Sequence, residues 1–230
     1  MVAVIGDIHG CYYTLDALYK NIKAKYPDIT VYCVGDLVDR GNFSYEVVEF
    51  FIRNGIPFTP GNHDFMFYAF FKEPNSLFAK SWVYNGNEAT LRSYLNYHDQ
   101  IEYHISYIKS APLYFNTDDC FISHAGISSH YKSKFSAARN NSDSLDSLIK
   151  SEFDSESGIL WTRDRLLNIG KLQVVGHTKQ YEVKLDSKAN ALYIDTGACV
   201  GNKLSSVIIH QNEVIEIIAE PTHNEDVAAI

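Results

Sequence analysis

The stretch MVAVIGDIHG, residues 1–10, decides the fold that we expect for this chain. A short apolar run, typical of a buried β-strand, leads directly into a tight turn bounded by Gly6 and Gly10. The turn carries Asp7 and His9, a carboxylate and an imidazole two positions apart. Both side chains are good metal ligands, so this strand end can supply half of a metal site. Alone, Asp-x-His is a weak signal, because the pair also occurs by chance in solvated loops.

The same order of features recurs further along the chain. In each case an apolar run is followed by a turn that holds residues able to bind a metal or a phosphate. These turns read GDLVDRG (35–41), GNHD (61–64), SHAG (123–126) and GHT (176–178). In a parallel α/β arrangement the loops after the strands emerge at one edge of the sheet, where ligands of such folds bind. The repetition therefore predicts one site assembled from five separate loops.

Composition limits the class of protein. The chain has 230 residues and no repeat or Pro/Ser/Gly-rich linker, which predicts one domain with a sizeable core. The formal net charge of -8 argues against a protein whose main task is to grip nucleic acid. The first apolar run stops at Gly6, too short for a signal peptide or a membrane span. We therefore expect a soluble, cytoplasmic protein with no nucleic-acid and no membrane partner.

The cysteines do not suggest a zinc or disulfide framework. Cys11, Cys33, Cys120 and Cys199 lie far apart and never reach CxxC spacing. Cys33 and Cys120 fall inside strand-like runs and are expected to be buried thiols. Cys199 has no basic neighbour in the sequence that would lower its pKa, so we do not expect a reactive thiol there.

The first half of the chain alternates strand-like and helix-like segments. Apolar residues at helical spacing predict one helix that is closed by Pro27 and another that is stopped by Gly55. The aromatic-rich middle, from Phe65 to about Lys109, is expected to be mostly helical and to form core and cap rather than a base-stacking platform. We expect strands at 30–35 and 56–60 and helices at 12–26 and 44–54.

The second half is expected to be mainly β-structure. A hairpin is predicted over 111–126, and a polar loop with a short helix near 145–149 over 130–157. Later strands are expected at 171–178, 191–197, 204–210 and 213–220, the last three forming a second sheet. We expect one domain over residues 1–220 and a flexible C-terminal tail over 221–230.

Taken in order, GDIHG, GDLVDRG, GNHD, SHAG and GHT resemble the motifs of the calcineurin-like metallophosphoesterases. Within them the chain is most similar to the phosphoprotein phosphatases, in particular to the small bacterial and bacteriophage serine/threonine protein phosphatases. The segments WVYNGNEATLRSY (82–94), LWTRDRL (160–166) and IDTGACVGNKLS (194–205) extend the resemblance over most of the chain. It implies an α/β (α+β) fold of two packed mixed β-sheets flanked by helices, with a binuclear metal site at the strand C-terminal ends.

The resemblance also implies the ligands of two divalent metal ions. Asp7, His9 and Asp36 would bind the first ion, and Asp36, Asn62, His124 and His177 the second, with Asp36 as the bridge. Mixed nitrogen and oxygen ligands accept several ions, and we expect Mn first, with Fe, Zn, Ni and Co as the other candidates. Two such ions lower the pKa of a bridging water, so that hydroxide attacks phosphorus in line with the leaving group.

The remaining catalytic groups of that family also have counterparts here. His63 would be the general acid that protonates the departing alkoxide, and Asp39 would orient its imidazole. Arg40 and Arg163 would bind the phosphoryl oxygens, since their fork-shaped donors match that geometry. Asn62 is expected at both the metal and the substrate.

A few positions separate two substrates. Pro60 stands where many protein phosphatases have Arg, and Asp64 replaces their Glu; GNHD and HAGI also occur in symmetric diadenosine tetraphosphate hydrolases. Asp39 and Thr178 favour a protein phosphatase, because the diadenosine tetraphosphate hydrolases that this chain resembles have GDLVxRG without the second Asp, and GHW in place of GHT. We therefore expect a serine/threonine protein phosphatase acting on a phosphorylated protein or peptide, with a dinucleoside polyphosphate as the alternative substrate.

A third interpretation is a non-catalytic binding module that keeps the fold as an interaction scaffold. Such a protein would be expected to have lost ligands. Because every expected ligand, the acid and both arginines are present, the sequence favours an enzyme.

Overall fold

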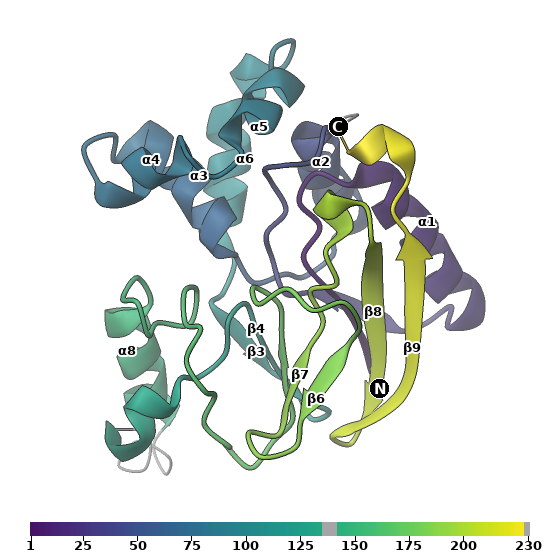
Figure 1. Ribbon diagram of the computed structural model, residues 1–230, viewed down its shortest axis with the longest axis vertical. Coiled ribbons are helices and arrows are strands. Elements are labelled where there is room, and N and C mark those ends of the chain that lie inside the picture. Colours follow the sequence, from purple (N-terminus) through teal and green to yellow (C-terminus); the bar gives the residue numbers. More distant parts are fainter. Residues whose placement is uncertain (135–141, 228–230) are drawn as a thin grey trace.

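The computed structural model describes residues 1–134 and 142–227, and it shows two β-sheets packed against each other between layers of helices (Figure 1). The first sheet has the strand order β2-β1-β8-β9 and the second β3-β4-β5-β7-β6. Each sheet contains parallel and antiparallel pairs. The expected fold of two mixed sheets flanked by helices is thus confirmed.

The strands are short except for the two last ones. They are β1 (Val2–Ile5), β2 (Thr30–Cys33), β3 (Tyr114–Asn116), β4 (Phe121–Ser123), β5 (Gln173–Val175), β6 (Lys184–Asp186), β7 (Ala191–Tyr193), β8 (Lys203–His210) and β9 (Glu213–Pro221). The α-helices are α1 (Tyr12–Lys25), α2 (Ser44–Asn54), α3 (Asn62–Lys72), α4 (Leu77–Trp82), α5 (Asn87–Ser93), α6 (Ile101–Ser110) and α8 (Ser142–Glu152). The described residues also form short 3-10 helices: η1 (His98–Gln100), η2 (Ser129–Tyr131), η3 (Ala198–Val200) and η4 (Asn224–Asp226).

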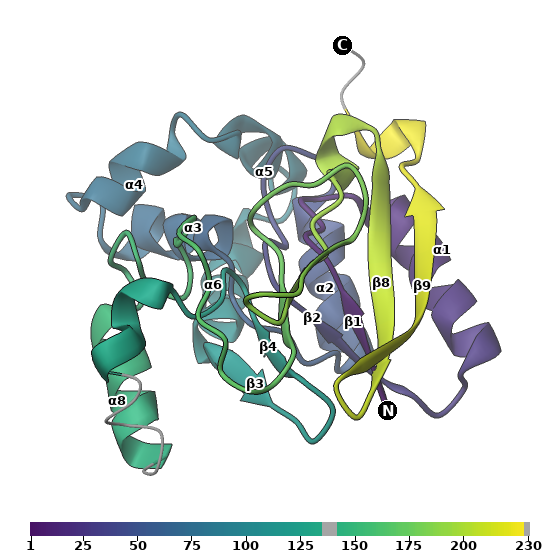
Figure 2. The ribbon, with the colours of Figure 1, turned by 60° about the horizontal axis from the view of Figure 1, so that its bottom comes forward.

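Strand β1 is apolar at every position because both of its faces are covered. Val2 and Val4 belong to the core between the two sheets, whereas Ala3 and Ile5 belong to the core that includes α1 and α2. Figure 2 shows α1 and α2 on the side of the first sheet that faces away from the second. A strand buried on both faces has no reason to alternate apolar and polar residues.

The parallel pairs bring the functional loops to one edge. Strand β1 runs parallel to β2, and β4 runs parallel to β5. The C-terminal ends of these four strands lead directly into the loops of GDIHG, GDLVDRG, SHAG and GHT. Ligands of α/β proteins bind at such strand ends.

The predicted helices at 12–26 and 44–54 are confirmed as α1 and α2, and Gly55 ends α2 in the left-handed conformation with φ 59°. The mostly helical middle is confirmed by the helices α3 to α6, and the predicted hairpin by the antiparallel pair β3-β4. The helix expected near 145–149 is longer, spanning Ser142–Glu152. Part of the predicted loop, residues 135–141, lies outside the described residues.

The prediction of a strand at 56–60 is wrong. This segment makes one isolated parallel bridge, between Cys33 and Phe58. Two prolines, Pro57 and Pro60, lie on either side of Phe58 and have no N–H to donate to a ladder. The chain therefore leaves the sheet at once and enters α3.

The prediction that the last strands form a second sheet of their own is also wrong. Strand β8 pairs antiparallel with β1, with Val2 opposite Ile209, and β9 pairs with β8. Strand β7 instead lies parallel to β5 in the second sheet. Strand β8 is buried at its six central positions, and that burial is met by a place in the middle of the first sheet.

The flexibility expected for the tail over 221–230 stays a prediction, but the structure gives part of this segment firm contacts. Asp226 is fully buried, and its carboxylate accepts hydrogen bonds from the backbone N–H groups of Tyr13 and Thr14 at 2.9 and 2.8 Å. The acidic tail is held because it meets unsatisfied N–H groups at the start of α1. Residues 228–230 lie outside the described part of the chain. Within the described ranges, no helix is both long and apolar enough to cross a membrane.

Candidate active site

Asp7 lies directly after β1 and is buried with an unsatisfied oxygen. Its Oδ2 accepts a hydrogen bond from the backbone N–H of His177 at 2.9 Å, whereas its Oδ1 has no hydrogen-bond partner among the described residues. Gly176 makes this approach possible, since a Cβ there would collide with Oδ1. Burial, with help from the Asp195 and Asp36 carboxylates, raises the pKa of Asp7 well above its usual value. A cation beside Oδ1 would satisfy that oxygen and favour the ionised form.

The ring of His9 presents one nitrogen to the same space. Its Nδ1–H donates to the carbonyl of Val38 at 2.9 Å, so Nε2 carries a lone pair and acts as an acceptor. Nε2 lies 3.3 Å from Oδ2 of Asp36. Burial lowers the pKa of His9 well below its ordinary value, so the ring is neutral and suited to ligation.

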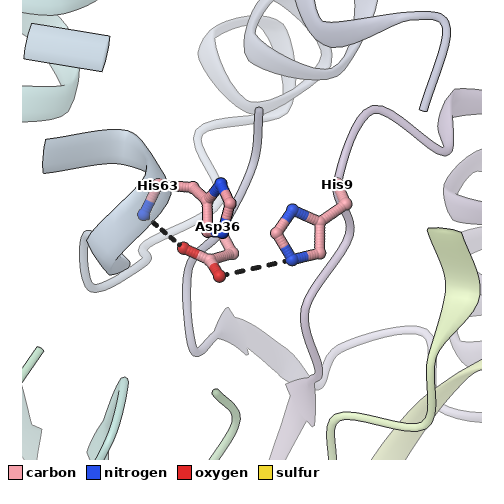
Figure 3. Close-up of side chains that lie close together, drawn as sticks. All are labelled: His9, Asp36 and His63. Atoms are coloured by element: carbon pink, nitrogen blue, oxygen red, sulfur yellow. Dashed lines mark hydrogen bonds and ion pairs between the residues drawn. The ribbon is translucent and has the colours of Figure 1, made fainter. Parts of the chain in front are cut away.

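Asp36 lies at the centre of the cluster (Figure 3). Its Oδ1 accepts a hydrogen bond from the backbone N–H of His63 at 2.9 Å, and its Oδ2 lies 3.6 Å from Nε2 of His124. Burial alone would raise the pKa of Asp36, but the surrounding histidines and Arg40 outweigh it and lower that pKa. Asp36 is thereby kept ionised between two groups of ligand-type atoms.

Three hydrogen-bond acceptors converge at Asn62, the first residue of α3. His124 donates its Nδ1–H to the carbonyl of Val34 at 3.0 Å, and His177 donates its Nε2–H to the carbonyl of Trp161 at 3.1 Å. These bonds leave a lone pair on Nε2 of His124 and on Nδ1 of His177. Both lone pairs face Oδ1 of Asn62, at 3.0 and 2.9 Å. Burial lowers the pKa of His124, and that of His177 to about 3, so neither ring supplies a proton to relieve the contact.

The residues therefore fit a pair of metal ions. Two ligand groups with atoms within 4.8 Å of one another share Asp36: one with His9 and His63, the other with Asp7 and His124. The orphaned oxygen of Asp7 and the facing lone pairs at Asn62 are contacts that a cation would stabilise. The division of ligands between two ions that the sequence suggests stays a prediction, and these groups contain four of its six residues: Asp7, His9, Asp36 and His124.

His63 is held by a buried carboxylate with further partners of its own. The Nδ1–H of His63 donates to Oδ2 of Asp39 at 2.7 Å. Asp39 is fully buried and also accepts from Nε1 of Trp82 at 2.8 Å and from Oγ1 of Thr90 at 2.7 Å. Sequence reasoning did not assign Trp82 and Thr90, although both lie in the segment 82–94. The signal was available, since a buried indole N–H requires an acceptor.

Arg40 connects the two histidines of one ligand group, His9 and His63. Its Nη1 donates to Nε2 of His9 and its Nη2 to Nε2 of His63, each at a distance of 2.8 Å. Its backbone N–H donates to the carbonyl of Gly86 at 3.1 Å, which fixes the loop of Arg40 against the start of α5. The structure also places Arg40 beside the Cys199 thiol, a basic neighbour that the sequence did not predict. Burial nevertheless outweighs Arg40 and raises the pKa of Cys199 to about 11.

The site opens into a pocket of about 330 Å³. Arg163 lies at its wall and donates from Nη1 to the carbonyl of His177 at 3.3 Å. Lys179, Cys199 and Val200 also line the pocket, and none of them was expected there. The predicted residues Asp36, Arg40, Asn62, His63 and His177 line the same pocket.

Asp64 has a structural part in the site. Its carboxylate accepts from the backbone N–H of Gly61 at 2.8 Å and from that of Leu37 at 2.9 Å. It thus caps the start of α3 and ties Asn62 and His63 to the loop after β2. The carboxylate at position 64 therefore serves to cap α3.

The loops of the site adopt costly backbone conformations. Among the described residues, eight non-glycine residues have a positive φ, and five of them belong to the site. They are His9, Asp36, Asp39, Arg40 and His177. Such strain is retained where the surrounding structure imposes it, which is typical of functional sites.

Comparisons with known proteins agree with this geometry. The sequence model of the calcineurin-like phosphoesterase family matches residues 1–204. The asymmetrical bis(5'-nucleosyl)-tetraphosphatase PrpE of Anoxybacillus flavithermus is 27% identical, over 93% of this chain and 92% of its own length.

Solved structures show the same fold. A chain named provisionally as a diadenosine tetraphosphatase superposes with a TM-score of 0.61 at 20% identity, covering 97% of this chain and 94% of that one. The cold-active protein-tyrosine phosphatase of a psychrophilic Shewanella species superposes with a TM-score of 0.57 at 19% identity, covering 94% and 80%. The family match spans all five loops that carry the candidate ligands, so the chain belongs to the calcineurin-like phosphoesterase family and is a metallophosphoesterase, a hydrolase of phosphate esters.

Proposed function

We propose that this enzyme is a protein phosphatase that hydrolyses phosphoserine and phosphothreonine esters. The observation that carries the proposal is the buried pair of His63 and Asp39, joined over 2.7 Å. An alkoxide leaving group is a strong base and needs a proton as the P–O bond breaks, and a fixed imidazole can provide it. A nucleoside phosphate leaving group is a weak base and gains little from such a donor.

The proposed reaction also requires divalent metal ions. We infer two divalent ions, with Mn first among Mn, Fe, Zn, Ni and Co, held by Asp7, His9, Asp36, Asn62, His124 and His177. When bound, such ions activate water and neutralise phosphate charge. The neutral histidines and the shared Asp36 provide the donors.

The other polar groups of the pocket act on the substrate. Arg163 lies at the pocket wall, where its guanidinium can bind two phosphoryl oxygens. Arg40 contacts Nε2 of His63 in this structure, and we infer that it turns to the phosphoryl group when substrate is bound. His63 is then free to carry a proton on Nε2 while Asp39 holds Nδ1. Loss of a general acid costs roughly 10² to 10⁴-fold in rate.

A second candidate substrate is a dinucleoside polyphosphate. The observation in its favour is the relative of A. flavithermus, which is named for that activity and aligns over 93% of this chain. Its identity of 27% leaves room for a different substrate on the same catalytic site.

The test compares substrates by leaving group. Metal-loaded wild type and His63→Asn are assayed on a phosphothreonine peptide, a phosphotyrosine peptide, p-nitrophenyl phosphate and diadenosine tetraphosphate, with metal content measured in each sample. We expect wild type to prefer the phosphothreonine peptide. The substitution should cost about 10² to 10⁴-fold on that peptide and far less on p-nitrophenyl phosphate, whose leaving group needs no proton. An equal loss on every substrate would contradict the role of His63, and a preference for the dinucleotide would contradict the protein substrate.

A further inference from the structure

A second hollow adjoins the catalytic pocket on the other side of Arg163. It has a volume of about 370 Å³, and Arg163 lines both hollows. Ala125 and Thr178 line it too, and each directly follows a ligand-type residue, His124 or His177. Much of the remaining wall comes from the edge strand β6, the turn after it and β7, which Figure 1 shows beside β6. A molecule bound at the catalytic pocket can therefore extend into this hollow.

The wall of the hollow carries more positive than negative charge. Lys184 and Lys188 line it, and both side chains are exposed. Neither forms an ion pair with any residue in the part of the chain that the structure describes. With Arg163 they give three cations in the wall of one hollow, in a chain whose net charge is -8.

The two carboxylates of the hollow are already engaged. Oδ2 of Asp164 accepts hydrogen bonds from the hydroxyls of Ser128 and Ser157, both at 2.9 Å. Oδ1 of Asp186 accepts from the backbone N–H of Lys188 at 2.9 Å and of Ala189 at 3.2 Å. These bonds hold the carboxylates in the turns of the wall. The wall thus has a net charge of +1, and its lysine ammonium groups form no ion pair with either carboxylate.

We propose that this hollow binds a second anionic group of the substrate, an acidic side chain two or three residues from the phosphorylated one. The proposal rests on the phosphoprotein phosphatase function. An extended peptide advances about 3.3 Å per residue, so that side chain lies roughly 7 to 10 Å along the chain from the phosphorylated residue. Arg163, which lines both hollows, lies between the two anions. Thr178 and Gln180 add hydrogen-bonding groups to the wall.

The experiment uses matched phosphothreonine peptides. One set carries Glu two or three residues before or after the phosphothreonine, and the other carries Gln at the same positions. Metal-loaded wild type, Lys184→Gln and Lys188→Gln are compared, with Lys80→Gln as a control that removes one charge from α4, outside both hollows. Turnover of p-nitrophenyl phosphate measures the reaction without a peptide, and diadenosine tetraphosphate provides a further arm.

We expect wild type to show a higher kcat/KM for the Glu peptide than for its Gln partner, by about two- to fivefold for each lysine that pairs with the carboxylate. Each lysine substitution should lower that ratio through KM and leave p-nitrophenyl phosphate turnover unchanged. Lys80→Gln should keep the wild-type ratio, and added salt should reduce it.

The outcomes separate this proposal from the one on which it rests. Turnover of phosphopeptides with equal rates for Glu and Gln partners overturns the subsite and leaves the phosphatase function intact. No turnover of any phosphopeptide overturns both. If the lysine substitutions impair only diadenosine tetraphosphate hydrolysis, the hollow binds a polyphosphate chain and the acidic side chain is excluded.

Discussion

Asp39 is the residue on which the proposed acid depends. It is fully buried, and three side chains hold its carboxylate: His63, Trp82 and Thr90. A carboxylate that accepts several bonds has a fixed orientation, and so has the imidazole that it contacts. The orientation of the His63 ring thus depends on Trp82 and Thr90, which donate to Asp39.

Trp82→Phe tests this dependence. The variant keeps an aromatic ring against Phe67 and Phe70 but removes the N–H that Asp39 accepts. We expect kcat on phosphothreonine peptide to fall about tenfold, equivalent to about 1.4 kcal/mol in the barrier, with KM little changed. Turnover of p-nitrophenyl phosphate should fall less, since that substrate needs the acid less.

The chain offers a matched control at Trp161. Its Nε1 is buried and has no hydrogen-bond partner among the described residues. Trp161→Phe therefore removes the same group without removing a bond, and it should keep near wild-type kcat. Equal losses in the two variants would show that ring volume matters and the Asp39 bond does not.

At the scale of elements, the last described segment ties two loops of the site together. The carboxylate of Asp226 caps α1, whose own N-cap residue Cys11 makes no side-chain capping bond to the helix. The carbonyl of Asp226 accepts from the backbone N–H of Asn42 at 2.9 Å. Since α1 follows the loop of His9 and Asn42 ends the loop of Asp39 and Arg40, one residue holds both loops in register.

Asp226→Ala should therefore weaken both the fold and the site. The substitution leaves the N–H groups of Tyr13 and Thr14 and the Thr14 hydroxyl without their acceptor, which we expect to cost about 1–3 kcal/mol of unfolding free energy. Mn²⁺ affinity, measured by titration calorimetry, should fall as the loop of His9 loosens. Glu225→Ala is the control, because the Glu225 side chain is exposed and its carbonyl still accepts from Asn42. Wild-type stability and affinity in Asp226→Ala would contradict this account.

At the scale of the whole molecule, a buried histidine of α6 joins that helix to α2 and to Tyr94 at the end of α5. His104 of α6 contacts Glu49 of α2 through Nε2 at 2.9 Å and the hydroxyl of Tyr94 through Nδ1 at 2.7 Å. Burial lowers the pKa of His104, although Glu49 opposes that shift. Neutral His104 can donate to Glu49 and accept from Tyr94, whereas the protonated ring cannot accept.

The sign of the resulting pH dependence follows from the lowered pKa. Below the ordinary histidine pKa of about 6.5, the unfolded chain binds a proton that the folded chain does not. The contribution of His104 is present above about pH 6.5 and is lost as the pH falls towards its folded pKa. Urea unfolding of His104→Asn between pH 7 and 5 should therefore show a weaker pH dependence than wild type, by at most about 1.4 kcal/mol per pH unit. His98→Asn, on an exposed ring, is the control; identical slopes in His104→Asn and wild type would refute the assignment.

The sequence predicted local features better than the pairing of distant strands. The candidate ligand residues, their order and the strand-to-loop positions could be read from local patterns, because a strand end followed by Gly and Asp or His is a local feature. The pairing of β8 with β1 could not, since residues 2–5 and 206–209 are distant in the chain and their apolar patterns fit several neighbours.

The same division applies to the site. The identities of Asp7, His9, Asp36, Asn62, His124 and His177 as candidate ligands came from the sequence alone. Only the tertiary structure decided which distant residues support the site: Trp82 donates to Asp39, and Asp226 joins α1 to the loop before α2. A ligand is chosen by its own chemistry, which its residue type displays. A supporting hydrogen bond depends on which distant donor is brought within about 3 Å, and folding alone determines that distance.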